Sequence, residues 1–314
     1  MPTGNGLTRR GFVTAVAASA GASKAALADD KPVPSKKAQP SPSRKVKSNT
    51  ICVFTKPFQS LSYDELADRI AALGVDGIEV PVRDKGHIQP AEVPDELPKM
   101  VEALKKRRLE ITILTSDIHR VDQPHAEATL RTAAKLGIQR YRMRYYRYDL
   151  RRPILDQLAE IRPMVKDLVA LNHELGISAV YQNHAGPTIL GAPLWDLHAL
   201  IQDYPIAQIG SAFDIRHATV EGGQCWPIQL KLLLPHINAV CVKDFRWDGR
   251  RPDNVPLGEG RVDRRFFALL RESDYRAPIS LHEEYLDHRD PKLVPEHLAA
   301  IRRDLDTLRT WLDA

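Results

Sequence analysis

From Thr50 onward the chain alternates between short apolar runs and longer segments in which apolar residues recur at helical spacing. The run TICVFT at 50–55 is short and rich in β-branched residues, as expected for a buried strand. It is followed by SYDELADRIAALG at 62–74, where Leu66, Ile70 and Leu73 share one face of a helix. The pattern therefore predicts strands and helices in alternation.

Eight such strand-then-helix units follow one another to the end of the chain. Strands are expected at 50–55, 75–82, 109–118, 139–146, 177–184, 207–215, 237–245 and 277–285. Helices are expected at 62–74, 95–108, 125–137, 154–176, 193–203, 227–236, 263–273 and 295–313. Their number and order predict an α/β fold, a (β/α)8 TIM barrel forming a single domain. The alternative is an open doubly wound sheet, which the eight units and the lack of a G-x-G-x-x-G motif after the first strand disfavour. No nucleotide cofactor is expected.

The N-terminal residues follow a different pattern. Arg9 and Arg10 precede a short apolar run that ends in a small-x-small cleavage pattern, which predicts a twin-arginine signal peptide over 1–28. A disordered basic N-terminus is the alternative. Residues 29–49 are rich in Pro, Ser and Lys, which is typical of a flexible, disordered linker to a barrel over 50–314. The expected location is periplasmic or otherwise outside the cytoplasm, with the export machinery as a partner. The apolar run is shorter than the ~20 residues of a membrane span, so no transmembrane segment is expected.

Charge separates the N-terminal segment from the body. Residues 1–50 hold nine Lys or Arg and two Asp or Glu. Subtracting these from the 45 basic and 40 acidic residues of the whole chain leaves 36 and 38, so the body is nearly neutral. Nucleic acid is therefore not an expected partner, since its binding needs a basic surface. Cys52, Cys225 and Cys241 have no C-x-x-C spacing, which excludes a metal cluster of the cysteine type.

Polar residues stand at the ends of most predicted strands. In a parallel barrel these ends open on one common mouth, and alternation along each strand selects the side chains that face the interior. The inward set is Glu79, Gln182, His184, Asp214, Lys243, His282 and Glu284. Asn183 and Glu283 fall on the opposite face. Such groups must bind one another, a metal or a polar ligand, because burying them unpaired is costly.

Each of these residues also has a structural interpretation. A strand-end histidine can be a satisfied core group, Asp214 can cap the next turn, and Lys243 with Glu284 can be a plain ion pair. For Arg142 and Arg144 the favoured interpretation is structural, either outward under the helices or solvated at the rim.

The sequence segments around these residues resemble those of a known family. They are VRDKGHIQP (82–90), YQNHAG (181–186), FDIRHATVEGG (213–223), VKDFRW (242–247), PLGEGRVD (256–263) and PISLHEEY (278–285). Their order and spacing are similar to an exported bacterial branch of the xylose-isomerase-like TIM barrels, the sugar phosphate isomerases/epimerases. The resemblance covers about 50–290 and implies the fold. It leaves the reaction open, because this superfamily hosts isomerases, epimerases, lyases and endonucleases.

The resemblance also implies a set of metal ligands. Metal-dependent members take Glu, Asp, His and Glu from strands five to eight. Asp214 and Glu284 match the Asp and the last Glu, whereas Gln182 and Cys241 stand where the first Glu and the His are expected. One interpretation is a shifted site for a divalent ion (Mn, Mg, Co or Zn), formed by His184, Asp214, His282 and Glu284. The other is a metal-free site in which Lys243 is the fixed cation.

Proton transfer beside a carbonyl needs a base and an electrophile that holds the enediolate. The candidates for catalysis are Glu79, Asp214, Lys243 and Glu284, with His184 assisting Lys243. Those expected to bind substrate are Arg83, His87, Gln182, His184, His217, Trp247, Glu259 and His282. The loop with Gly258 and Gly260 either closes over a ligand or only turns the chain.

The function predicted from these features is a sugar isomerase or epimerase. Its partner would be a small carbohydrate, unphosphorylated because phosphorylated sugars are scarce outside the cytoplasm, and a homo-oligomer is left open. Two alternatives are a keto-glycoside lyase, which shares the first step, and a non-catalytic sugar-binding barrel. An endonuclease of abasic sites is disfavoured by the nearly neutral body.

Overall fold

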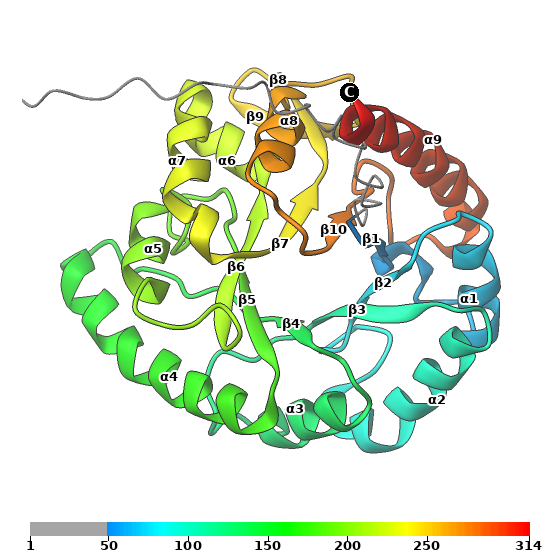
Figure 1. Cartoon of the computed structure of the whole chain (residues 1–314), viewed down its shortest axis with the longest axis horizontal. Helices are drawn as coiled ribbons and strands as arrows, with labels where there is room; N and C mark the ends of the chain where they lie inside the picture. The colour runs from blue at the N-terminus through cyan, green and yellow to red at the C-terminus, as the bar shows by residue number, and fades with distance from the viewer. Residues whose placement is uncertain (1–48) are drawn as a thin grey trace, which may run out of the picture. The chain divides into compact units, whose positions relative to one another are not determined.

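The computed structural model describes residues 49–314 (Figure 1). Eight parallel strands close into a barrel in the order β1-β10-β7-β6-β5-β4-β3-β2, which confirms the predicted TIM barrel. These strands are β1 (Ile51–Phe54), β2 (Gly77–Pro81), β3 (Glu110–Thr115), β4 (Arg140–Arg142), β5 (Ser178–Gln182), β6 (Ile209–Asp214), β7 (Ile237–Val242) and β10 (Ile279–Leu281). The predicted signal peptide and all but the last residue of the predicted linker lie outside the described residues.

Helices surround the barrel (Figure 1). They are α1 (Tyr63–Ala71), α2 (Val93–Lys105), α3 (Ala126–Lys135), α4 (Ile154–Leu175), α5 (Trp195–Ile201), α6 (Ile215–Gly222), α7 (Trp226–Leu233), α8 (Arg265–Glu272) and α9 (Val294–Asp313). Local chemistry sets their ends: a capping box between Ser62 and Glu65 starts α1, and Gly176 ends α4 with a φ of 65°. No helix within 49–314 has the length and apolar character needed to cross a bilayer.

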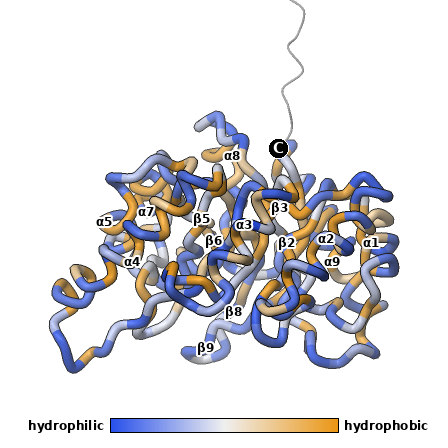
Figure 2. Tube along the Cα trace, turned by 90° about the horizontal axis from the view of Figure 1, so that it is seen from below, coloured by the Kyte–Doolittle hydropathy of each residue, from blue (hydrophilic) through white to orange (hydrophobic). Residues whose placement is uncertain are grey.

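The strands are buried on both faces. Apolar faces of the helices cover the outside, and hydrophilic positions gather in the peripheral loops (Figure 2). Inside the barrel, small and branched side chains form a separate apolar cluster: Cys52, Ile113, Val180, Ala212, Ala239 and Cys241. This packed interior leaves only the mouth for chemistry.

Several elements differ from the sequence pattern. The strand expected at 277–285 is regular only over Ile279–Leu281. His282 still donates its backbone N–H to Val242 at 2.9 Å, and the chain then turns where the Glu283 carboxylate accepts from the backbone of Tyr285 and Leu286. The strand expected at 237–245 ends at Val242, and the chain continues into an antiparallel hairpin, β8 (Asp244–Asp248) and β9 (Arg251–Val255). Helix α6, also not predicted, starts directly after β6, where the Asp214 carboxylate accepts from the backbone N–H of His217 at 3.1 Å.

One buried carboxylate fixes the loop that follows the hairpin. Asp244 accepts backbone N–H groups from Gly258 and Gly260, each at 3.0 Å, and from Arg261 and Val262 at 2.8 and 2.9 Å. A Cβ at Gly260 would lie 2.2 Å from Asp244 Oδ1, so only glycine fits there. The loop is thus held against the hairpin.

The four backbone hydrogen bonds that Asp244 accepts, here called the Asp244 cradle, predict an effect on stability. Asp244→Ala should lower the free energy of unfolding by about 3 kcal/mol, because buried backbone donors lose a charged acceptor. Urea denaturation measures the change. The matched control is Asp248→Ala on the exposed end of the hairpin, which should stay within about 0.5 kcal/mol of the parent. Equal losses in the two variants would contradict the proposed role of the cradle.

Candidate functional site

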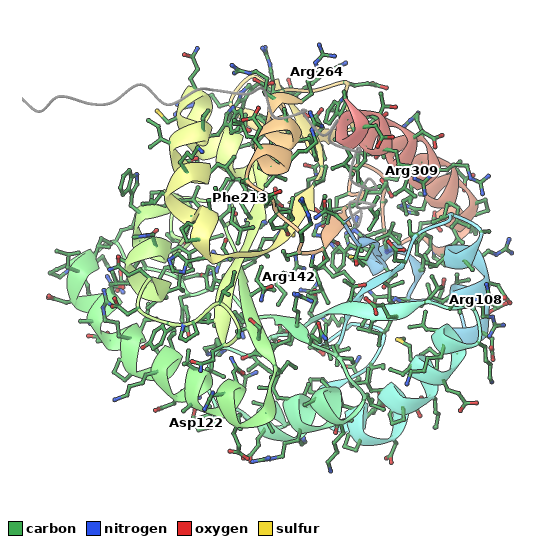
Figure 3. All side chains as sticks on the ribbon, viewed as in Figure 1. Arg108, Asp122, Arg142, Phe213, Arg264 and Arg309 are labelled. Carbon is green, nitrogen blue, oxygen red and sulfur yellow. The ribbon has the colours of Figure 1, made fainter. Side chains whose placement is uncertain are left out.

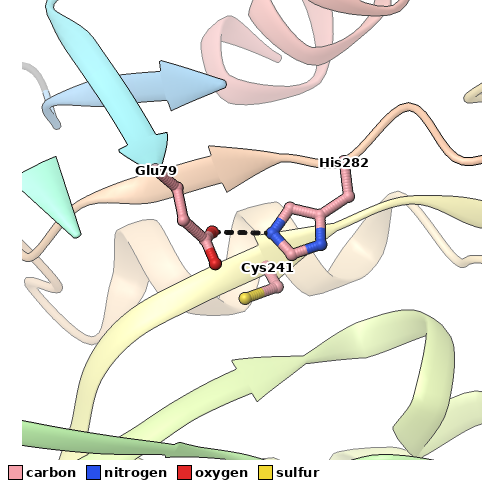
Figure 4. Close-up of side chains that lie close together, drawn as sticks. All are labelled: Glu79, Cys241 and His282. Atoms are coloured by element: carbon pink, nitrogen blue, oxygen red, sulfur yellow. Dashed lines mark hydrogen bonds and ion pairs between the residues drawn. The ribbon is translucent and has the colours of Figure 1, made fainter. Parts of the chain in front are cut away.

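The first charged centre of the barrel mouth is built around Glu79, at the end of β2. Its side chain is fully buried and accepts hydrogen bonds from Thr115 Oγ1 (2.6 Å), Ser280 Oγ (2.6 Å) and His282 Nε2 (2.8 Å; Figure 4). Arg142 Nε lies 3.2 Å from Oε1. Burial opposes ionisation, but Arg142 and His282 outweigh it and hold the pKa of Glu79 well below its usual value. With four partners, Glu79 is an ionised anchor, and any part in proton exchange would require those partners to release it.

Arg142 lies inside the barrel mouth, which corrects the expectation of an outward or solvated group. Figure 3 shows it within the ring of strands. Its guanidinium lies over the Phe54 ring at 4.9 Å, and Nη1 donates to Gln182 Oε1 at 2.5 Å. The physical reason is that the buried charge of Glu79 compensates that of Arg142. Arg144, two residues further along the chain, is exposed, as expected for a residue at the rim of the barrel.

The second centre joins Asp214, Lys243 and Glu284. Lys243 Nζ donates to Glu284 Oε2 at 2.6 Å and lies 3.5 Å from Asp214 Oδ2. Lys56 Nζ, from the end of β1, lies 3.6 Å from the other oxygen of Glu284. Burial disfavours both charged forms, but the ion pair dominates: it raises the pKa of Lys243 and lowers that of Glu284. Lys243 is therefore a cation fixed between two carboxylates.

Gln182 connects the two centres. Its Oε1 accepts from Arg142 and from Tyr145 Oη, each at 2.5 Å, and its Nε2 donates to Asp214 Oδ2 at 2.8 Å. Asn183 points away, as predicted from alternation, and exchanges two hydrogen bonds with the backbone of Asp214, at 2.7 and 3.0 Å. This clamp aligns the ends of β5 and β6.

Two histidine rings, tilted relative to each other by 35°, are in contact near Lys243. The ring centroids of His184 and His217 are 3.8 Å apart. His184 Nδ1 lies 2.8 Å from the carbonyl oxygen of Ala185, which can only accept, so we assign the proton to Nδ1 and leave Nε2 as a free acceptor. Burial, reinforced by the Lys243 charge, lowers the pKa of His184 to about 4, so the ring is neutral at pH 7.

The tautomer of His217 is the opposite one. Arg216 Nη1 lies 3.0 Å from His217 Nδ1, and a guanidinium only donates, so the proton of the neutral ring sits on Nε2. Burial and the Lys243 charge hold the pKa of His217 well below its usual value. Nε2 is buried, has no hydrogen-bond partner among the described residues, and lies 3.6 Å from Asp214 Oδ2. It is a donor available to a ligand.

The remaining predicted residues divide into two groups. His87 lies at the mouth, where its Nε2 is 3.0 Å from the carbonyl oxygen of Thr55 at the end of β1. Arg83 lines a cavity that also contains Arg142 and Tyr145. Trp247 and Glu259 are not brought to the charged centres. Trp247 is an exposed residue of β8 that lines a different cavity with Trp226, and Glu259 is exposed on the loop held by the Asp244 cradle.

The sequence pattern does not select Lys56, Thr115, Tyr145 and Ser280 as residues of the mouth, and for Arg142 it favours a structural interpretation. Their polar partners lie between 36 (Thr115 to Glu79) and 228 (Lys56 to Glu284) positions away in the sequence, so no local signal pairs them. The signal that could have found Arg142 and Thr115 is inward phase at a strand end, the criterion that identified Glu79 and Gln182.

The donors of the mouth bear on metal binding. Within residues 49–314, one group of three or more metal-ligating side chains has its ligand atoms within 4.8 Å of one another: Glu79, Cys241 and His282 (Figure 4). This buried triad could bind a metal ion, provided that the thiol, whose pKa burial raises, loses its proton and that His282 exchanges its hydrogen bond to Glu79 for the ion. The shifted site that is one of two interpretations of the sequence, formed by His184, Asp214, His282 and Glu284, is not such a group within the described residues. The Lys243 ammonium bridges two of its residues.

The fold and this mouth define a TIM barrel with a polar, charge-balanced site at the carboxyl ends of its strands. Residues 67–311 match the family model described as xylose isomerase-like TIM barrel, and the chain belongs to that family. No curated protein matches the sequence.

Solved structures share the fold at low identity. A D-allulose 3-epimerase from Methylomonas is 17% identical with a TM-score of 0.65, covering 84% of this chain and 98% of its own. A 3-keto-D-glucoside 4-epimerase from E. coli is 17% identical with a TM-score of 0.64, covering 84% and 100%. A probable 3-DHS dehydratase from Bacillus anthracis is 16% identical with a TM-score of 0.58, covering 80% and 98%. The structural relatives thus include sugar epimerases and a dehydratase.

The ion pairs of Lys243 predict a pH-dependent stability. Lys243→Met should lower the free energy of unfolding by about 3 kcal/mol near pH 7, because Glu284 and Asp214 lose their shared cation. The lowered pKa of Glu284 adds stability above about pH 5 that is lost as the pH falls, and the raised pKa of Lys243 adds stability below about pH 10 that is lost as the pH rises. The difference in the free energy of unfolding between Lys243→Met and the parent protein should therefore become smaller as the pH falls toward about 3.5.

Urea denaturation at several pH values tests this prediction. Lys166→Met, on the exposed face of α4, is the matched control and should change stability little at any pH. A deficit of Lys243→Met that does not vary between about pH 3.5 and 7 would contradict it.

Proposed function

We propose that this protein is a sugar isomerase or epimerase that moves a proton beside a carbonyl group of an unphosphorylated sugar or glycoside. One observation carries the proposal: a free acceptor, His184 Nε2, and two donors, the Lys243 ammonium and His217 Nε2–H, lie together at the barrel mouth. Abstraction beside a carbonyl requires this combination, an acceptor for the proton and donors for the oxygen that becomes negative.

The proposed reaction starts with transfer of the proton on the carbon next to the carbonyl to His184 Nε2. The electron pair of that C–H bond forms the C=C bond of an enediolate, and the carbonyl π electrons move to its oxygen. Lys243 and His217 hold this oxygen, without a change in their own protonation. Isomerisation requires the hydroxyl proton to pass from the adjacent oxygen to the former carbonyl oxygen while His184 returns its proton to the former carbonyl carbon. Epimerisation requires a second group, protonated from solvent, to deliver a proton to the opposite face of the original carbon while His184 releases its own to solvent. Glu284, a partly exposed carboxylate at the mouth, is the candidate for a second exchange group.

The other mouth residues position these groups. Asp214 holds Lys243 by charge and the backbone of His217 by a hydrogen bond. Gln182 fixes Asp214 through its amide, and Glu79 fixes Arg142 and His282. Because all of these contacts exist before a ligand binds, the donors are oriented without reorganisation during the reaction.

A metal ion, if bound, would be held by Glu79, Cys241 and His282 and would supply Lewis acidity for the carbonyl oxygen. A thiolate and an imidazole favour zinc, or cobalt, over magnesium or manganese. The steps above use only the side chains of the chain itself.

The substrate class follows from two supports. Relatives of the same fold act on D-allulose and on 3-keto-D-glucosides, by their descriptions. The twin-arginine pattern of residues 1–28 supports membership of an exported branch and work outside the cytoplasm, where free sugars and glycosides are the available substrates. Elimination from a 3-keto-glycoside is a second candidate, since a dehydratase shares the fold and an enediolate can expel a group from the adjacent carbon.

Solvent deuterium exchange tests the proposed proton transfer. In D2O, the purified protein should place deuterium on the carbon next to the carbonyl of a keto-sugar panel that includes D-allulose, D-fructose and a 3-keto-glucoside, read by NMR. His184→Gln should slow exchange by about 100-fold or more, because it removes the acceptor and keeps the polar shape. His173→Gln, on the exposed side of α4, is the matched control and should exchange at the parent rate.

The same spectra distinguish the alternatives. A new unsaturated product identifies elimination. Absence of exchange with every member of the panel, in protein with and without added Zn²⁺, would overturn the isomerase proposal in favour of a non-catalytic sugar-binding barrel.

A further inference from the structure

A cavity of about 170 Å³ lies beside the proposed site, at the carboxyl ends of β3 and β4. Its lining is rich in arginine: Arg83, Arg142, Arg144 and Arg147, together with Thr115, Ser116, Asp117, Met143 and Tyr145. Asp117 is the one carboxylate in this lining. A cavity with four guanidinium groups and one carboxylate carries an excess of positive charge in a molecule whose body is close to neutral.

The arginines differ in how their charges are compensated. Arg142 pairs with Glu79. Arg83 is only partly exposed, yet within residues 49–314 its side chain has neither an ion pair nor a hydrogen bond. Burial and the nearby charge of Arg142 lower the pKa of Arg83, and the Asp117 carboxylate offsets this only in part. Holding such a charge in place is costly unless a ligand completes it.

The cavity shares residues with the proposed site. Arg142 and Tyr145 line the cavity, and both donate to Oε1 of Gln182. The amide nitrogen of Gln182 in turn donates to Asp214. The Tyr145 ring also contacts His184, with centroids 5.0 Å apart. A ligand whose reacting carbons lie at His184 could therefore extend a neighbouring group past Tyr145 into the cavity.

We propose that this cavity binds a carboxylate of the substrate, so that the natural substrate is a sugar acid. The inference rests on the proposed function for the location of the reacting carbons. Guanidinium groups match the planar carboxylate with paired hydrogen bonds. A phosphate offers a similar oxyanion, but the proposed function places the protein outside the cytoplasm, where phosphorylated sugars are scarce, and this favours the carboxylate.

Calorimetric titration with D-glucuronate, D-glucose and inorganic phosphate tests the inference without requiring turnover. The parent protein should bind glucuronate at least about 10-fold more tightly than glucose, as expected for charge-assisted hydrogen bonds. Arg83→Met should remove most of this preference. Arg144→Met, at an exposed position, should reduce it without risk to folding. Arg162→Met, exposed on α4, is the matched control and should keep it.

Equal affinity for glucuronate and glucose in the parent protein would overturn the inference, as would a preference that survives both Arg83→Met and Arg144→Met. Binding of inorganic phosphate more tightly than glucuronate would overturn the carboxylate assignment. The isomerase proposal is judged separately by deuterium exchange: a glucuronate preference without exchange contradicts the reaction, and exchange without a preference contradicts the sugar acid.

Discussion

Charge compensation inside a closed barrel mouth is the constraint on which the rest of this structure depends. Parallel strands deliver their carboxyl-terminal side chains to one place with little water, where every buried charge needs an opposite partner. Glu79 is matched by Arg142, and Lys243 is matched by Asp214 and Glu284. Because these pairs come from strands far apart in sequence, satisfying them also fixes the relative alignment of the strands.

Gln182 makes this arrangement possible, and it explains the departure from the metal-dependent pattern. An amide can accept from Arg142 on one side and donate to Asp214 on the other. A glutamate in its place could only accept, and its charge would repel Asp214 unless a cation stood between them. With glutamine at this position, Lys243 is the cation beside Asp214. Burial, reinforced by the same cation, lowers the pKa of His184 and of His217 and keeps both rings neutral, and their backbone and guanidinium partners make one an acceptor and the other a donor.

The sequence predicted the barrel well because its evidence is local and repeated. Each strand is a short apolar run and each helix an apolar stripe, so eight units in order leave few alternatives. Alternation along the strands also separated Gln182 from Asn183 correctly. The prediction failed where the local pattern is ambiguous. The stretch after Val242 has the pattern of a continued strand but forms a hairpin. Arginine is usually a surface residue, whereas Arg142 is buried.

The sequence by itself determined the fold, the common mouth, and the strands that bring polar groups to it, because these follow from periodicity and from the direction of parallel strands. Only the tertiary structure decided which groups pair. Arg142 turned inward because Glu79 lies opposite it, the proton positions of His184 and His217 were set by Ala185 and Arg216, and Trp247 was carried by the hairpin to a different cavity. The contact between Arg142 and Glu79 joins residues that are remote in sequence. The histidine contacts are made with adjacent residues, but they depend on side-chain orientations that burial selects and no local pattern records.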